Sequence, residues 1–159
     1  MFSKWLVCCT LVAGVAGIAG YCLGQSGNAP VKEAKITSIS LQHFDKAEEV
    51  AYPFGWIRWL MSRDLDGQAE QTFGIVEIKA HQKNALHLHP NCEELLYVLS
   101  GSCEHLVGDQ KVVLHPGDLL RVPRAVRHQA VVLGNEPLRA VISYSSADRQ
   151  VVNLGETKE

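Results

Sequence analysis

Hydrophobic and polar residues alternate along most of the chain after residue 35. The alternation comes in short runs separated by glycine, proline and asparagine, which is typical of β-strands joined by tight turns. We expect strands near 39–41, 56–61, 76–78, 94–100, 103–107, 111–114, 119–122, 129–133 and 138–144. No long helical period interrupts these runs, so the pattern predicts an all-β fold, an antiparallel sandwich or barrel.

The N-terminal region differs, because residues 5–24 form an uncharged, mostly apolar run preceded by Lys4. A helix of about 20 residues just spans a bilayer core. A short cationic start followed by an apolar stretch and small residues also describes a cleavable signal peptide. Both interpretations remain open for residues 1–24, and both predict an exported, periplasmic or otherwise extracytoplasmic domain. We expect a polar linker at 25–35, the β-domain at 36–149 and a polar tail at 150–159.

Charge and length narrow the function classes. The 159 residues carry a formal net charge of −2, and lysine and arginine are scattered. Because the sequence has no cluster of basic residues, we do not expect it to bind nucleic acid. After the apolar run, enough chain remains for one domain with a real core.

Four residues are spaced to bind one metal ion. His87 and His89 face the same side of a strand because alternate side chains share a face. Pro90 and Asn91 break that strand, and the next strand can return Glu94 to the interior while Glu93 points away. His128 follows further along the chain. Imidazole and carboxylate ligands suit a divalent transition metal, and the spacing does not choose among Fe, Mn, Ni, Zn and Cu.

These residues resemble the two motifs of the cupin family. The first motif is G-x5-H-x-H-x3,4-E-x6-G, matched by His87, His89, Glu94 and Gly101, with His81 at the leading glycine. The second is G-x5-P-x-G-x2-H-x3-N, matched by Gly117, Pro123 and His128, with Ala125 at its second glycine and Val132 at its asparagine.

The resemblance covers residues 70–146 and implies a double-stranded β-helix, the jelly-roll or cupin barrel, preceded here by the N-terminal apolar helix. It also implies the metal ligands His87, His89, Glu94 and His128. Without an internal repeat we expect one such domain. Dimers are common in the family, and the apolar Val151, Val152 and Leu154 could add a strand or a contact of a homodimer.

For the histidines, the cysteines and the possible cavity residues outside the four candidate ligands, the sequence supports less specific expectations. We expect His43, His105 and His115 to be partly exposed, and His81 to lie in a surface loop. Cys92 and Cys103 could form a disulfide or remain free thiols. Some of the following residues must face the cavity: Arg58, Trp59, Met61, Arg63, Arg121, Gln129 and Tyr144. An inward arginine would favour an anionic substrate. No general base stands out, so the catalytic residues are unknown.

Three functions fit the sequence. A metal-dependent enzyme of the oxygenase type is favoured, because three histidines and one glutamate leave up to two positions on an octahedral ion for a substrate oxygen and O₂. A non-redox isomerase, lyase or decarboxylase would use the metal as a Lewis acid. A non-catalytic module would only bind a small ligand.

Overall fold

The computed structural model describes residues 33, 35 and 39–155, and eleven β-strands lie among them. They are β1 (Glu49–Tyr52), β2 (Gly55–Met61), β3 (Thr72–Ile78), β4 (Leu86–Leu88), β5 (Glu94–Ser100), β6 (Ser102–Val107), β7 (Gln110–Leu114), β8 (Leu119–Val122), β9 (His128–Leu133), β10 (Leu138–Tyr144) and β11 (Val152–Gly155). Within these described residues, no helix has the length and apolar character needed to cross a membrane. The predicted apolar helix at 5–24 lies outside them.

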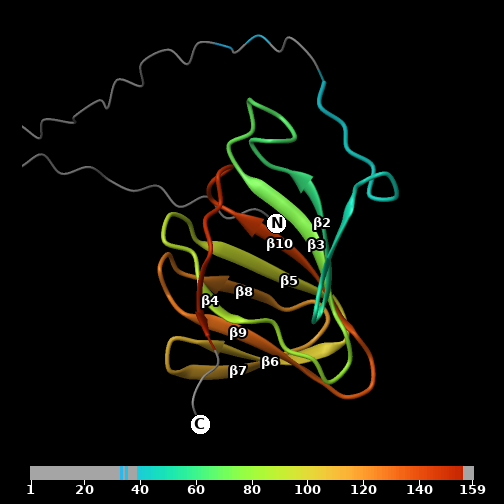
Figure 1. Ribbon diagram of the computed structural model, residues 1–159, viewed down its shortest axis with the longest axis vertical. Helices are drawn as coiled ribbons and strands as arrows, with labels where there is room; N and C mark the ends of the chain where they lie inside the picture. The colour runs from blue at the N-terminus through green and yellow to red at the C-terminus, as the bar shows by residue number, and fades with distance from the viewer. Residues whose placement is uncertain (1–32, 34, 36–38, 156–159) are drawn as a thin grey trace, which may run out of the picture. The chain divides into compact units, whose positions relative to one another are not determined.

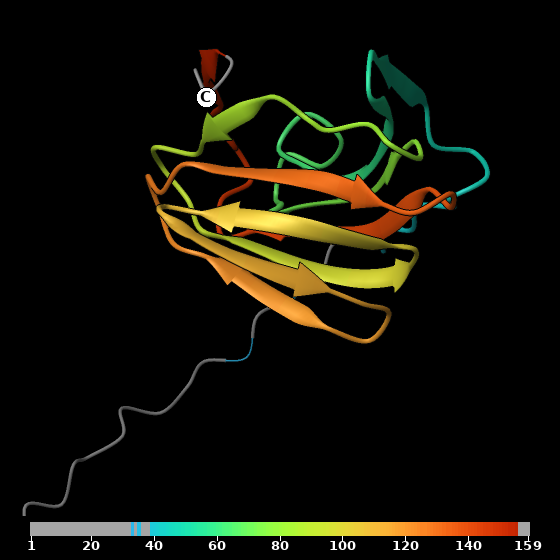
Figure 2. The same cartoon turned by 90° about the horizontal axis from the view of Figure 1, so that it is seen from below.

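The strands form two antiparallel sheets within one compact unit, whose described residues are 39–155. One sheet has the order β1-β2-β3-β10-β5-β8 and the other β11-β4-β9-β6-β7 (Figure 1). The turned view shows β9, β6 and β7 side by side in orange and yellow (Figure 2). Neighbouring strands in the sheets are mostly distant in sequence, as in a jelly roll. The predicted all-β, double-stranded β-helix is confirmed.

Strict alternation of side chains builds the interior. Along β3, β5 and β10 every second residue is buried, because successive side chains of a strand point to opposite faces. The first sheet contributes Val76, Ile78, Leu96, Val98, Ala140 and Ile142 to the core, and the second contributes Cys103, Leu114, Ala130 and Val132. The two inner faces therefore close on a shared apolar interior.

Strand positions agree closely with the pattern in the sequence. The predicted strands 94–100, 119–122 and 138–144 have the observed bounds. The strand expected near 39–41 is absent, since Ile39 and Leu41 are 86% and 69% exposed and the first strand begins at Glu49. Alternation alone was misleading there, because a strand also needs a partner strand and a face to bury.

The segment expected as a polar C-terminal tail contains a strand. β11 pairs antiparallel with β4, with Val152 opposite Leu88 and Asn153 opposite His87. The apolar residues near 151–154 thus add a strand to the barrel. β4 is only three residues long, so this pairing fixes the strand that carries His87.

Both glycine positions that the sequence replaces in the family motifs keep a left-handed backbone. His81 has φ 61° and Ala125 has φ 59°, and no other non-glycine residue among those described has a positive φ. Glycine is the usual residue in this region because it has no Cβ to clash with the following carbonyl. The two turns therefore keep the geometry of the motif without its glycines.

Candidate metal centre

The four predicted ligands meet inside the barrel although different strands carry them. His87 on β4 lies opposite His128, the first residue of β9. His89 follows β4, and Glu94 begins β5. One donor atom of each residue lies within 4.8 Å of the other three, and only His87 is not fully buried. The group could hold one metal ion.

The register of β5 separates two adjacent carboxylates, as the sequence predicted. Glu94 is 4% exposed and faces the histidines. Glu93 turns the other way and accepts a hydrogen bond from Arg121 Nε at 2.7 Å. Only Glu94 can reach the group, because neighbouring residues of a strand lie on opposite faces.

Backbone carbonyl groups orient all three imidazoles. Nδ1 of His87 donates to Ala85 O at 2.8 Å, Nδ1 of His89 to Gln150 O at 2.7 Å, and Nδ1 of His128 to Val126 O at 2.9 Å. A carbonyl oxygen can only accept, so each Nδ1 carries the proton. The Nε2 atoms are then free to present lone pairs, which is the tautomer required of a metal ligand.

A positive charge is needed where these lone pairs converge. Nε2 of His128 and Nε2 of His89 lie 3.1 and 3.2 Å from the same Glu94 oxygen. Despite that short distance, His89 Nε2 is buried without a well-formed hydrogen bond. Lone pairs of neutral rings repel a carboxylate unless a cation lies between them. A proton could satisfy one such pair, and a divalent ion could satisfy the whole set, so the residues fit a metal.

The ionisation of the group agrees with this requirement. Burial raises the pKa of Glu94, but His128 and His89 outweigh it whenever they carry a second proton on Nε2, and the net pKa is well below its ordinary value. Burial, together with the charge on His128, lowers the pKa of His87 to about 4. For His128, burial is outweighed by Glu94, which raises the pKa. At neutral pH the group combines an ionised carboxylate with at least one neutral imidazole, as metal binding requires.

A fourth histidine lies against the group, contrary to expectation. His105 on β6 is 1% exposed, and its ring stacks on His128 with centroids 5.9 Å apart. Burial lowers the pKa of His105 to about 4. The expectation of partial exposure was wrong because β6 alternates, so His105 shares the inward face of Cys103. That alternation was the signal in the sequence that could have placed it.

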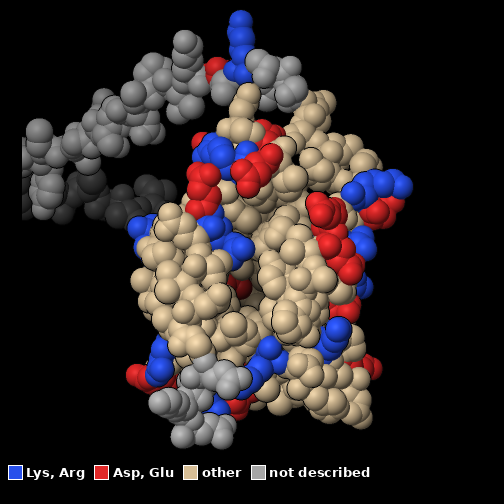
Figure 3. Space-filling model, in the orientation of Figure 1, with Lys and Arg blue, Asp and Glu red and all other residues tan. Residues whose placement is uncertain are grey.

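A cavity of about 500 Å³ opens above the group. Its wall is largely apolar and includes Phe54, Ile57, Val76, Ile78, Leu96 and Ile142, while Glu94, His87, His105 and His128 also line it. Figure 3 shows a hollow in this face of the domain, bordered mostly by uncharged residues, with acidic atoms deep inside. This size and lining suit a small organic molecule.

Tyr144 is the one predicted cavity candidate that lines this space. Its ring lies edge-on to His89 with centroids 4.8 Å apart. Burial and the Glu94 charge raise its pKa well above the ordinary value, so the phenol keeps its proton. Other candidates are engaged elsewhere. Arg58 pairs with Glu49, Arg63 with Asp148 and Arg121 with Glu93, and Gln129 donates to Asn84 O.

The remaining histidines and cysteines have simpler roles. His43 and His115 are exposed, and the exposed His81 contacts Asn135 in a loop. Cys92 and Cys103 are free thiols with no exposed surface. Both are too buried to serve as reactive groups, and burial raises the pKa of each.

The sequence did not single out two residues after β10: Arg149, the last residue of the predicted β-domain, and Gln150, the first of the predicted tail. Gln150 offers the carbonyl that orients His89. Arg149 lines the cavity. Neither belongs to a recognisable motif, and only the return of the chain past β4 brings them to the centre.

Comparison with known proteins agrees with the observed fold. A family model described as the cupin domain matches residues 74–144. Three curated proteins are similar over part of the chain. An uncharacterized protein of Methanocaldococcus jannaschii is 25% identical over 60% of this chain and 80% of its own length. The protein SchB of Streptomyces halstedii is 29% identical, over 55% of this chain and 63% of its own. The tetracenomycin polyketide synthase protein TcmJ of Streptomyces glaucescens is 30% identical, over 57% of this chain and 61% of its own length.

Solved structures share the architecture. Oxalate decarboxylase of Lactobacillus farciminis superposes with a TM-score of 0.66 at 21% identity, covering 70% of this chain and 35% of its own. A mutant of the Bacillus subtilis oxalate decarboxylase gives a TM-score of 0.64 at 22% identity, and the match covers 70% of this chain and 31% of the enzyme. The chain spans only about a third of these enzymes, and at this identity the likeness concerns the fold. Residues 74–144, which match the family model and carry all four members of the buried His/Glu group, therefore form a cupin domain.

Proposed function

We propose that this protein is a metal-dependent enzyme of the oxygenase type that converts a small, largely apolar organic molecule. The observation that carries the proposal is the orientation of His87, His89 and His128. Their Nδ1 protons are bound to backbone carbonyls, and their Nε2 atoms converge with Glu94 beside the cavity. A pure binding module has little need for a complete ligand set.

A bound Fe(II) or Mn(II) would supply a Lewis-acid and redox centre with coordination positions left open for substrate and O₂. The protein's own residues would do the rest. The apolar wall would bind the substrate and exclude water, which strengthens the electrostatic interactions inside. Tyr144 keeps its proton and lines the same cavity, so its ring would lie against the substrate.

A non-redox reaction is the second candidate. The same ligand set could act without O₂ as a Lewis acid in an isomerase, lyase or decarboxylase, and the structurally similar B. subtilis oxalate decarboxylase has Mn(II) centers. The cavity weighs against a molecule as small as oxalate, because about 500 Å³ with apolar walls favours a larger and less polar substrate.

The test begins with elemental analysis of protein purified without added metal. Oxygen consumption is then followed with phenols, thiols and carboxylates, aerobically and anaerobically. We expect about one transition-metal ion per chain and substrate-dependent O₂ uptake, both lost in Glu94→Gln and kept in Glu93→Gln. Turnover that persists without O₂ would favour the non-redox candidate. Bound metal with no turnover of any compound would favour the binding module.

We also propose that the domain functions outside the cytoplasm, in the periplasm or an equivalent compartment. Support comes from the uncharged run at 5–24 and Lys4. A reporter active only after export, fused after residue 40, should be active. A fusion with charged residues placed inside the run should be inactive, and equal activity of both fusions would refute export by this segment.

A further inference from the structure

Arg149 occupies a distinctive place at the wall of the cavity. Its guanidinium carbon lies 5.0 Å from the ring centroid of Tyr144 and 4.6 Å from that of Trp59. Tyr144 in turn contacts His89. The positive charge therefore lies one aromatic ring away from the metal group, in a cavity that is otherwise mostly apolar.

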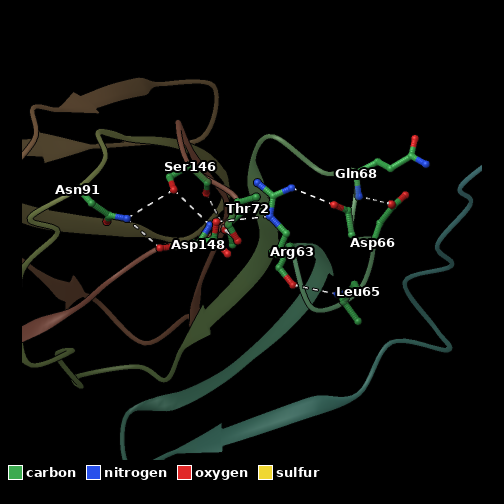
Figure 4. A network of polar contacts seen from close by, with 11 residues as sticks. Arg63, Leu65, Asp66, Gln68, Thr72, Asn91, Ser146 and Asp148 are labelled. Carbon is green, nitrogen blue, oxygen red and sulfur yellow. Dashed lines mark hydrogen bonds and ion pairs between the residues drawn. The ribbon is translucent and has the colours of Figure 1, made fainter.

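The backbone around Arg149 is held firmly by polar contacts. The Asn91 side chain donates to Asp148 O at 2.8 Å and accepts from Gln150 N at 3.0 Å. It therefore hydrogen-bonds the backbone of both neighbours of Arg149. Thr72 Oγ1 donates to Ser146 O at 2.8 Å (Figure 4). Because Gln150 O also accepts from His89, the segment that carries Arg149 is tied to the metal group itself.

Within the described part of the chain, the Arg149 guanidinium makes no hydrogen bond and no ion pair. Its aromatic neighbours stabilise the cation from the side but leave its five N–H donors free. The adjacent carboxylate, Asp148, is directed to Arg63. Glu94 is engaged with His89 and His128. A guanidinium positioned this way lacks an anionic partner.

We propose that Arg149 binds the carboxylate of the substrate, so that the substrate class is a monocarboxylic acid with an apolar body. The proposal rests on the function proposed above. A planar guanidinium binds a carboxylate through two parallel hydrogen bonds, and its stacking on Trp59 and Tyr144 fixes its orientation beforehand. The apolar body would lie against Ile57, Val76 and Ile142, which line the same cavity.

Lys83 is the rival cation, because it also lines the cavity. It is exposed, and its flexible ammonium lacks the aromatic contacts that hold Arg149. Lys83→Gln is therefore the matched control for Arg149→Gln, since both changes remove one positive charge from the same cavity.

The experiment measures binding of acids and of their neutral amides by calorimetry at neutral pH, where the acids are ionised. The probes are benzoate, phenylacetate and hexanoate, each paired with its amide. Metal-free protein is used first, so that no metal can bind the carboxylate, and zinc-loaded protein second. Melting temperature and metal content of each variant establish that the fold and the centre are intact.

We expect wild type to bind at least one acid about tenfold more tightly than its amide. Arg149→Gln should bring that ratio to about one, Arg149→Lys should retain part of it, and Lys83→Gln should leave it within about twofold. A ratio near one for every pair in wild type, an unchanged ratio in Arg149→Gln, or a loss in Lys83→Gln instead would overturn the proposal. A clear acid preference without turnover would refute the proposed enzyme and leave the carboxylate site standing.

Discussion

At the scale of single residues, the centre depends on which face of a strand each side chain occupies. Glu93 and Glu94 are adjacent, yet one pairs with Arg121 outside and the other lies with three imidazoles inside. His105 shows the same principle, because its place in the alternation of β6 buried it against His128. The amino-acid type alone does not show whether such a glutamate or histidine is buried or exposed; its position in the alternation of the strand does.

Adjacent glutamates offer a direct check of the centre. Glu94→Gln should weaken metal affinity by more than about a hundredfold, because it removes a charged ligand from a buried group. Glu93→Gln should leave affinity unchanged. Titration with Zn(II) or Mn(II) in the presence of a competing chelator measures both. Loss of affinity in Glu93→Gln alone would show that the strand register is wrong by one residue.

His105 should make the metal-free protein less stable in acid. Burial lowers its pKa in the folded protein to about 4, from the ordinary imidazole value of 6.5. The unfolded chain therefore binds this proton first, and stability present above pH 6.5 is lost as the pH falls toward 4. The resulting loss in the free energy of unfolding is on the order of 3 kcal/mol at most.

Urea unfolding of the metal-free protein at several pH values measures this effect. His105→Gln should flatten the decline between pH 6.5 and 4, although His87 contributes a decline of the same sign. His115→Gln, at an exposed position, should follow wild type. An equally steep decline in His105→Gln would contradict the prediction.

At the scale of elements, short segments with few partners position the ligands. β4 spans three residues and is held by β11 on one side and by a single register pair with β9 on the other. The turn at Ala125 also contributes, since Ala125 N donates to His89 O at 2.8 Å. Small changes in these elements should therefore affect the centre.

Removal of β11 should loosen β4 and the histidine on it. A chain ending at Val151 loses the backbone partners of Leu86–Leu88, so we expect faster amide exchange there and metal affinity lower by roughly tenfold. A chain ending at Gly155 keeps β11 and serves as the control. Unchanged exchange at Leu86–Leu88 in the shorter chain would show that β9 alone holds the strand.

Glycine should be better than alanine at the left-handed turn of residue 125. Ala125→Gly removes the strain of φ 59° and is expected to raise the free energy of unfolding by up to about 1 kcal/mol. Gly101→Ala is the opposite case, because φ is 71° and a Cβ would collide with Pro137 O. Gly101→Ala should lower the free energy of unfolding by at least about 2 kcal/mol. Denaturant unfolding measures both, and stabilisation by Gly101→Ala would be incompatible with this structure.

At the scale of the whole molecule, the two sheets make one domain around a shared core. The core draws on both sheets and all its members lie between Val76 and Tyr144. The outer face of β5 and β8 exposes Leu95, Tyr97, Leu99 and Leu119. The expected homodimer stays a prediction, for which this apolar face is one available surface.

A chain that begins at residue 30 should fold without the N-terminal run. We expect a circular dichroism spectrum dominated by β-structure, a cooperative thermal transition and the metal content of the full chain, because the core cluster and the described hydrophobic side chains packed against it all follow residue 53. The full-length chain in detergent is the comparison. A non-cooperative transition or a helical spectrum for the shorter chain would contradict the prediction.

The sequence by itself determined most strand positions, the inward face of Glu94 and the grouping of His87, His89 and His128 with it. These properties are local, since period-two alternation and turn residues specify which side a strand buries. The four candidate ligands could be grouped because the spacing of imidazole and carboxylate residues is recognisable in the sequence.

Tertiary structure alone decided the partners that the ligands require. The burial of His105 against His128, the pairing of β11 with β4 and the arrival of Arg149 and Gln150 at the cavity all depend on strands distant in sequence. The strand expected at Ile39 and Leu41 failed for the same reason, since no sheet accepts it. Alternation specifies a face, but only the closed barrel specifies what that face meets.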